Sequence, residues 1–302
     1  MRAVVTGATG AIGVALVNHL KREGCHVLVL THESSLRIFR LHPSNLVEIA
    51  VCGMDDYKTF DAAPDYDAFF HLAWTGGNAR NNIESNLKSM ICSIEAVNLA
   101  KRLGCSVFIG AGTQAECGRT TEKISADTPC FPESPFAAAK LGAYQMTKFK
   151  CGELGIRHIW ARILSVYGPF DGEQTMLISS IRKLLSHETV AFTKGEQEWD
   201  FLYAGDAAEA LFLLAIKGHG VRIYAIGSGI ARPLEEYIRI MCEKMGHSSG
   251  SDLGSIPYRE KEVMYLCADI NDLTKDTGWR PRISFEDGIE ETIKYCIENP
   301  IT

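Results

Sequence analysis

The sequence lacks any apolar run of about 20 residues, the length that a membrane-spanning helix needs. Its first residues read directly as a strand, so we expect no signal peptide. It also lacks an excess of positive charge, because 31 Lys and Arg stand against 37 Asp and Glu and the formal net charge is −6. This balance gives no electrostatic footprint for nucleic acid. We therefore expect a cytoplasmic protein that binds neither nucleic acid nor a membrane.

Paired cysteines are absent as well, since the ten cysteines are scattered singly and none forms a C-x-x-C pair. Metal-ligand spacing is therefore missing, and no metal site is expected. Single reduced thiols are typical of cytoplasmic proteins, and we expect several of these cysteines to serve as small core residues. Internal repeats and low-complexity segments are also missing. The 302 residues suffice for one large domain or two unequal lobes.

A short apolar strand at residues 2–5 runs into T-G-A-T-G-A-I-G, and a helical pattern follows. Strand, glycine turn and helix form the context of a dinucleotide-binding site. Gly7 permits a tight turn, Gly10 lets the backbone approach a pyrophosphate, and Gly13 lets the helix pack close to the strand. N–H groups at the helix start then face the anion, whereas the alternative is a glycine turn without a ligand. The residues assigned to this part of the cofactor site are Gly7, Thr9, Gly10, Ala11 and Ile12.

The residues after the second strand, at 25–30, bear on the choice of cofactor. An NAD site usually places an acidic residue there to hold the ribose hydroxyls, and Glu33 could do so. His32 and Arg37 better suit the 2′-phosphate of NADP, as do Ser34 and Arg40. A solvated polar loop is the remaining alternative. The sequence favours NADP, with NAD as the alternative, and assigns His32 and Arg37 to its binding.

Further strands are expected at residues 46–51, 67–73 and 107–110, with a long helix at 82–103. Alternation of strands and helices at this spacing predicts an α/β fold with a doubly wound parallel sheet of the Rossmann type. Asp55 follows the strand at 46–51, Leu72 and Ala73 end the strand at 67–73, and all three are assigned to cofactor binding. We interpret His71 as a packed histidine, because nothing near it in sequence pairs with it.

The segment G-T-Q-A-E-C-G at 112–118 follows a strand's carboxyl end, where ligands bind in such sheets, and P-F-A-A-A-K at 135–140 opens another helix. These motifs and the glycine spacing resemble the extended short-chain dehydrogenase/reductases, in particular the NAD-dependent epimerase/dehydratase group that acts on nucleotide sugars. The resemblance implies that Thr113 is the catalytic hydroxyl. It implies that Lys140 is the lysine of Y-x-x-x-K, which lowers the tyrosine pKa and holds the nicotinamide ribose. The tyrosine position is Phe136.

Phenylalanine at this position keeps the ring and loses the acid, which leaves several interpretations open. The chain could be a natural non-catalytic relative, or Phe136 could have been changed from a tyrosine. Another group, such as Tyr144, Cys117 or a water held by Thr113, could transfer the proton. Phe136 could also be a simple core residue of an amphipathic helix.

Two later segments continue the resemblance, each with a departure. R-I-L-S-V-Y-G-P at 162–169 resembles R-x-x-N-V-Y-G-P, with Ser165 in place of the substrate-contacting asparagine. G-E-Q-E-W-D-F-L-Y at 195–203 resembles G-x-Q-x-R-D-F-V-H, with Trp199 in place of an arginine that meets the phosphates. The residues assigned to substrate binding are Trp74, Thr113, Gln114, Ser165 and Trp199. Asp206 is expected to cap a helix at 207–217, and a last helix is expected at 285–297.

We expect a dinucleotide-binding domain at 1–164, completed by segments near 200–228, and a mainly substrate-binding lobe at 165–302. The resemblance implies an enzyme that epimerises, dehydrates or reduces a nucleotide sugar by hydride transfer with NADP or NAD. The alternative is a non-catalytic NAD(P)-binding regulatory protein. The resemblance also implies a homodimer through helices at 82–103 and 136–154, where Met90, Ile94 and Val97 are apolar positions beyond the face that covers the sheet.

Overall fold

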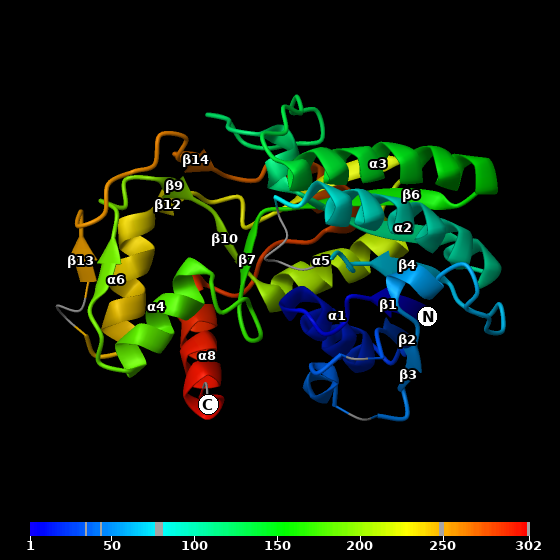
Figure 1. Ribbon diagram of the computed structural model, residues 1–302, viewed down its shortest axis with the longest axis horizontal. Helices are drawn as coiled ribbons and strands as arrows, with labels where there is room; N and C mark the ends of the chain where they lie inside the picture. The colour runs from blue at the N-terminus through cyan, green and yellow to red at the C-terminus, as the bar shows by residue number, and fades with distance from the viewer. Residues whose placement is uncertain (34, 43, 76–80, 248–250, 301–302) are drawn as a thin grey trace.

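The computed structural model describes residues 1–33, 35–42, 44–75, 81–247 and 251–300 (Figure 1). Ser34, which the sequence suggested for the 2′-phosphate, lies outside the described residues, as does most of the small polar loop after Thr75.

A seven-stranded sheet with the order β11-β6-β5-β4-β1-β2-β3 forms the centre of the larger part of the molecule. Every neighbouring pair in it is parallel. The strands are β1 (Arg2–Thr6), β2 (His26–Thr31), β3 (Val47–Val51), β4 (Ala68–His71), β5 (Val107–Thr113), β6 (Arg157–Ile163) and β11 (Arg222–Ile226). The expected doubly wound parallel sheet is confirmed, and β5 runs beyond its expected end as far as Thr113.

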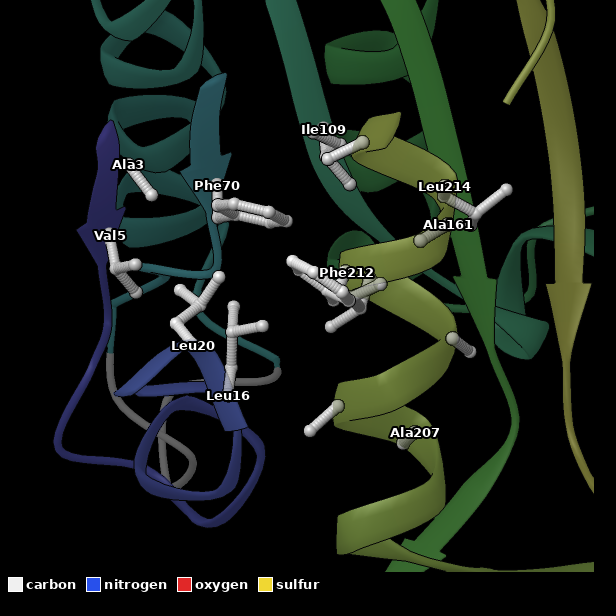
Figure 2. Close-up of a cluster of buried hydrophobic side chains, with 14 of the residues drawn as sticks. Ala3, Val5, Leu16, Leu20, Phe70, Ile109, Ala161, Ala207, Phe212 and Leu214 are labelled. Atoms are coloured by element: carbon white, nitrogen blue, oxygen red, sulfur yellow. The ribbon is translucent and has the colours of Figure 1, made fainter. Parts of the chain in front are cut away.

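Helices cover both faces of this sheet (Figure 1). One face carries α1 (Ala11–Arg22) and α5 (Ala204–Lys217), and the other carries α2 (Ile83–Arg102) and α3 (Pro135–Leu154). Figure 2 shows Leu16, Leu20 and Phe212 from the first pair of helices reaching the interior that Val5 and Phe70 of the sheet also line. Full burial of each such side chain contributes about 1.5–3 kcal/mol to folding.

The smaller part of the molecule lies beyond the carboxyl ends of the sheet strands (Figure 1). Its helices α4 (Met176–Leu185), α6 (Leu234–Lys244) and α8 (Phe285–Glu298) share a separate buried cluster. Short strands surround them: β7 (Ser165–Tyr167), β8 (Val190–Phe192), β9 (Glu198–Trp199), β10 (Phe201–Tyr203), β12 (Arg232–Pro233), β13 (Ser251–Leu253) and β14 (Tyr265–Leu266).

The chain passes repeatedly between the two parts after residue 165. It returns to the sheet as α5 and β11, leaves it for α6, and returns once more as α7 (Asn271–Thr277), which packs near β11 and α5. It then leaves for the last time to form α8. The larger part is therefore assembled from distant pieces of sequence.

The cap predicted at Asp206 is wrong. Helix α5 begins at Ala204, with Tyr203 at its N-cap position, so Asp206 lies within the first turn. Its buried carboxylate accepts N–H groups from Arg282 and Ile283, both at 2.9 Å. Asp206 thus holds the segment that leads into α8, a long-range contact that gives no local sequence signal.

The surface expected on α2 also needs correction. Val97 is fully buried against the sheet, and Met90 and Ile94 are partly buried. The Met90 sulfur packs against Gly142 of α3, so closely that a Cβ added at Gly142 would come within 2.7 Å of it. Met90 therefore fills the seam between the two helices. The exposed apolar row of α2 consists of Ile83, Leu87 and Ile91. Their spacing of four residues places them on one helix face, turned away from the sheet.

Within the described ranges, no helix has both the length and the apolar character needed to cross a membrane. No group of His, Cys, Asp and Glu side chains in the same ranges is arranged to hold a metal ion.

Candidate active site

The glycine turn between β1 and α1 is shaped by two close backbone contacts. Gly7 has a φ of +69°, and a Cβ there would come within 2.6 Å of the Leu72 carbonyl carbon and the Ala73 nitrogen. A Cβ on Gly13 would come within 2.3 Å of the Gly7 oxygen. Only glycine fits both positions without moving the backbone. Leu72 and Ala73 therefore lie directly against the turn, as a shared cofactor site requires.

Gly10 differs from the other two glycines because space remains beside it. The nearest atom to a Cβ built there is the Gly7 oxygen at 3.6 Å. Gly10 is also the N-cap of α1, where no side chain caps the helix and no acidic residue occupies the first turn. The first backbone N–H groups of a helix have no partner within it and favour an anion. The backbone of Thr9, Gly10, Ala11 and Ile12 could therefore hold the pyrophosphate of a dinucleotide.

The end of β2 brings cationic and polar groups toward the same turn. Arg40, in a short 3-10 helix (Ile38–Arg40), donates to the Thr9 carbonyl at 3.0 Å and lies over the Phe170 ring. Arg37 precedes this helix and is exposed, as is His32, whose ring lies beside Gly53. Asp55 is also exposed and accepts from Lys88 at 2.7 Å.

Lys140 lies on α3 and is buried, with 6% of its surface exposed. Its Nζ donates to the Ala111 carbonyl of β5 at 2.7 Å and sits 4.0 Å from the centre of the Trp74 ring. Burial lowers the pKa of this amine to about 7, although the Glu116 carboxylate acts in the opposite direction. The lysine is therefore held at the carboxyl end of β5, where the fold places ligands.

Phe136 lies one helical turn before Lys140 and on the same face. Its ring meets Trp74 edge-on, with centroids 6.0 Å apart and an interplanar angle of 89°, and its centroid is 6.0 Å from the Lys140 Nζ. Trp74 is in turn fixed by a hydrogen bond from its indole N–H to Asn86 at 3.0 Å. The motif predicted that Phe136 and Lys140 share a helix face, and the structure adds Trp74 as a neighbour of both.

Thr113 is the last residue of β5 and the N-cap of a short 3-10 helix (Gln114–Cys117). Its hydroxyl accepts from the Ala115 N–H at 3.3 Å, and Gln114, partly buried, begins the helix. A hydroxyl that accepts one hydrogen bond still has its own proton to donate.

Glu116 and Arg162 form a buried ion pair behind this turn, with 0% and 1% of their side chains exposed. One carboxylate oxygen meets the Arg162 Nε at 3.2 Å, and the other accepts from the Thr113 N–H at 2.8 Å and from Trp160 at 3.1 Å. Such a pair is tolerated in the interior because its oxygens are satisfied by further hydrogen bonds. Glu116 was not predicted from the sequence, since nothing in the motif marks that carboxylate as buried.

The two departures in the substrate segments meet in space. The Trp199 indole N–H, on β9, donates to the Ser165 hydroxyl, at the start of β7, over 2.8 Å. Both side chains are partly buried at the border between the two parts of the molecule.

The two side chains considered as substitutes for tyrosine are both poorly suited to that role, for different reasons. Tyr144 is two helical turns beyond Phe136, about 12 Å along the axis, and packs against His158 and Trp160 of β6. Cys117 is 2% exposed, and its hydrogen bond to Cys130 together with burial raises its pKa. A neutral, buried thiol is a poor proton acceptor.

His71 is a packed histidine, as the sequence predicted. Its Nδ1 pairs with the Thr6 hydroxyl at 2.9 Å and its Nε2 with the Ser93 hydroxyl at 3.0 Å. Burial lowers its pKa to about 3, so the ring is neutral near pH 7.

Comparison with known proteins identifies the family and agrees with the fold. Residues 3–227 match the NAD dependent epimerase/dehydratase family. CDP-abequose synthase from Salmonella typhimurium is 25% identical over 312 residues, covering 96% of this chain and 97% of the relative. UDP-N-acetylglucosamine 4-epimerase from Methanobrevibacter ruminantium, solved with UDP-N-acetylmuramic acid, has a TM-score of 0.88 at 22% identity and 98% coverage of both chains. UDP-glucuronic acid 4-epimerase from Bacillus cereus, solved with UDP-glucuronic acid and NAD, has a TM-score of 0.87 at 21% identity and 99% coverage of both chains. The chain belongs to the NAD-dependent epimerase/dehydratase family, a group of the extended short-chain dehydrogenase/reductases.

Proposed function

We propose that this protein is an NAD(P)-dependent enzyme that epimerises, dehydrates or reduces a nucleotide-linked sugar, with Phe136 at the position of the usual tyrosine. The observation that carries the proposal is the placement of Lys140. Its amine is buried at the carboxyl end of β5, between Ala111 and the Trp74 ring. Burying an amine in this way is costly to folding, which a ligand-binding role explains.

Each assigned residue has a role in this proposal. Gly7, Gly10 and the start of α1 hold the pyrophosphate, with Asp55, Leu72 and Ala73 along the rest of the cofactor. Lys140 binds the nicotinamide ribose, and Thr113 donates a hydrogen bond to the reacting sugar oxygen. The nicotinamide, when bound, accepts or supplies the hydride.

The substrate side is formed by Trp74, Gln114, Ser165 and Trp199. Because Trp199 donates to Ser165, the serine hydroxyl keeps its proton for a substrate oxygen. The relatives named above carry a CDP- or UDP-linked sugar in their names. A nucleoside diphosphate sugar is accordingly the substrate class that we propose.

For the cofactor we propose a preference for NADP over NAD. The support is the positive charge of Arg37 and Arg40 after β2, close enough for Arg40 to reach the Thr9 carbonyl. A 2′-phosphate adds charge that such groups can pair with. The Bacillus cereus relative binds NAD, and that cofactor remains the alternative.

A non-catalytic NAD(P)-binding protein is the second candidate, and Phe136 is the observation that favours it. A phenyl ring neither donates nor accepts a proton. Tyr144 packs two helical turns away, and Cys117 is buried with a raised pKa, so neither is suited to replace it.

The experiment that separates the two candidates is turnover of a panel of CDP-, UDP- and dTDP-linked sugars by the unmodified chain and by Phe136→Tyr. Proton transfer by a positioned side chain typically contributes about 10²–10⁴-fold, so we expect the variant to gain by that factor with little change in cofactor affinity. Phe149→Tyr, at an exposed site on the same helix, is the matched control.

Two results would contradict the expected gain of the Phe136→Tyr variant. Fast turnover by the unmodified chain would mean that another group supplies the proton. A variant that binds cofactor yet stays inert with every sugar would favour the non-catalytic candidate.

We further propose that residues 1–164, completed by segments near 200–228, bind the cofactor and that residues 165–302 mainly bind the substrate. Separate buried clusters in the two parts support this division. A cytoplasmic location is proposed as well, supported by the ten free cysteines.

Finally, we propose a homodimer through the outer faces of α2 and α3. These helices lie side by side, and together they expose large apolar side chains that a second copy would cover. The residues are Ile83, Leu87, Ile91, Met146 and Phe149.

A further inference from the structure

Two cysteines lie against each other beside the candidate active site. Cys117 ends the short helix that Thr113 caps, and Cys130 lies in the loop that leads to α3. The Phe131 N–H donates to the Cys117 carbonyl at 3.4 Å, so the two backbone segments are neighbours. The two thiols are close enough to shift each other's pKa in opposite directions. Cys117 is buried, whereas Cys130 is partly exposed.

A fixed cation faces the exposed member of the pair. The Arg162 Nη2 lies 3.3 Å from the Cys130 sulfur. The same guanidinium is held by Glu116 through Nε at 3.2 Å and by the Ser125 carbonyl through Nη1 at 2.8 Å. Because these partners hold it, Arg162 stays next to the sulfur.

This arrangement favours the thiolate at Cys130. The hydrogen bond from Cys117 and the charge of Arg162 together lower the Cys130 pKa to about 6, against desolvation and the nearby Glu116 carboxylate. Burial acts in the opposite direction on other thiols, and it raises the pKa of Cys105 and of Cys151 to about 12. Thiolate character and access to solvent are what make a cysteine reactive.

We propose that Cys130 and Cys117 form a peroxide-sensitive thiol pair, in which Cys130 is the attacking thiol and Cys117 resolves the product as a disulfide. The Cys130 thiolate attacks one oxygen of hydrogen peroxide, the O–O bond breaks, and hydroxide leaves, which gives a sulfenic acid at Cys130. The Cys117 sulfur then attacks the Cys130 sulfur, and the sulfenic hydroxyl leaves as water with the Cys117 proton. Sulfur has been oxidised by two electrons and peroxide reduced to two water equivalents. A dithiol reductant reverses the change.

The pair spans two segments that flank the candidate site. Cys117 follows Thr113 by four residues, and Cys130 precedes Phe136 by six. A disulfide between them removes the charge that faces Arg162, the partner of Glu116, which in turn holds the Thr113 N–H. The chemistry itself does not depend on the proposed function.

The test is peptide mapping of the unmodified full-length protein after brief exposure to hydrogen peroxide, and in parallel after a limiting pulse of iodoacetamide at neutral pH. We expect a Cys117–Cys130 disulfide that dithiothreitol removes, and alkylation of Cys130 at least about tenfold faster than of any other cysteine in the folded protein. No disulfide at this pair, or labelling of Cys130 no faster than of the buried cysteines, would overturn the proposal.

Two single variants separate the roles of the thiols. In Cys117→Ser, peroxide should stop at a sulfenic acid on Cys130, which dimedone traps. In Cys130→Ser, neither rapid alkylation nor dimedone labelling should remain at Cys117. If Cys117 still reacts rapidly in that variant, Cys130 is not the attacking thiol and the assignment is wrong. Cys92→Ser, which removes a buried thiol from α2, is the matched control and should behave as the unmodified chain.

Discussion

Lys140 is the residue at which burial and chemistry conflict. Its pKa falls from 10.5 to about 7, chiefly through desolvation. Between those pH values the unfolded chain binds a proton that the folded chain does not, so this amine makes the free energy of unfolding rise with pH. The destabilisation is complete below about pH 7 and disappears above pH 10.5.

Lys140→Met should therefore stabilise the fold while weakening cofactor binding. We expect a higher Tm than that of the unmodified chain at about pH 6, and a gap that narrows toward about pH 9. Thermal unfolding between about pH 6 and pH 9 measures this difference in Tm. Lys148→Met, on the same helix, is the control for loss of charge alone. A gap that is constant or widens with pH would contradict the assigned cause.

Arg37 is the residue on which the proposed cofactor preference can be tested. It is exposed and precedes Arg40, which binds the glycine turn. We expect NADPH to bind more tightly than NADH, and Arg37→Ala to narrow the difference by about tenfold because a charge-assisted contact to the 2′-phosphate is lost. Calorimetry with NADPH and with NADH measures the two affinities. Arg239→Ala, which removes an exposed charge from α6, is the control. Equal or reversed affinities in the unmodified chain would refute the preference.

Individual residues were predictable from the sequence only where a motif fixes their spacing. Phe136 and Lys140 are four apart on one helix, so the pattern alone places both on one face. The roles of Glu116 and Cys130 could not be predicted in this way, because their partner Arg162 lies far along the chain, on β6. Trp199 and Ser165 were each identified, but the hydrogen bond between them depends on how β7 and β9 meet.

At the scale of elements, the turn between β1 and α1 predicts opposite results at two glycines. The Cβ of Gly10→Val makes only an ordinary van der Waals contact, with the Gly7 oxygen at 3.6 Å, so we expect a normal Tm and loss of both NADP and NAD binding. Gly13→Ala places a Cβ within 2.3 Å of the Gly7 oxygen, so we expect a clearly lower Tm. Calorimetry and thermal unfolding distinguish the two. Unchanged dinucleotide affinity in Gly10→Val would remove the turn from the cofactor site.

The strands and helices around this turn were predictable because alternation and helical spacing reflect burial on the same sheet. The errors occur where burial depends on a second element. Val97 was expected at the surface of α2, but it lies under the helix against the sheet. Asp206 was expected to cap α5, but its carboxylate binds a segment that lies far along the chain.

At the scale of the whole molecule, the exposed face of α2 and α3 predicts how the protein assembles. Phe149→Glu places a charge within that face, so we expect the proposed dimer to dissociate at micromolar concentration. Light scattering coupled to gel filtration measures the mass. Ile297→Glu, at an exposed apolar site on α8, should leave the dimer unchanged. A monomeric unmodified chain would exclude this assembly.

The repeated passage of the chain between its two parts has a consequence for biosynthesis. The apolar underside of β1, β4 and β5 is covered by α1 from the start of the chain but also by α5, which is translated about two hundred residues later. The nascent polypeptide therefore emerges from the ribosome with half of that face uncovered. About one hundred residues separate the end of β5 from the end of α5, so at a typical elongation rate of about 5–20 residues per second this lasts on the order of five to twenty seconds. During that interval the growing chain is a substrate for chaperones. A chain that stops after β6 would never gain α5, so its apolar face would stay exposed and the fragment would tend to aggregate.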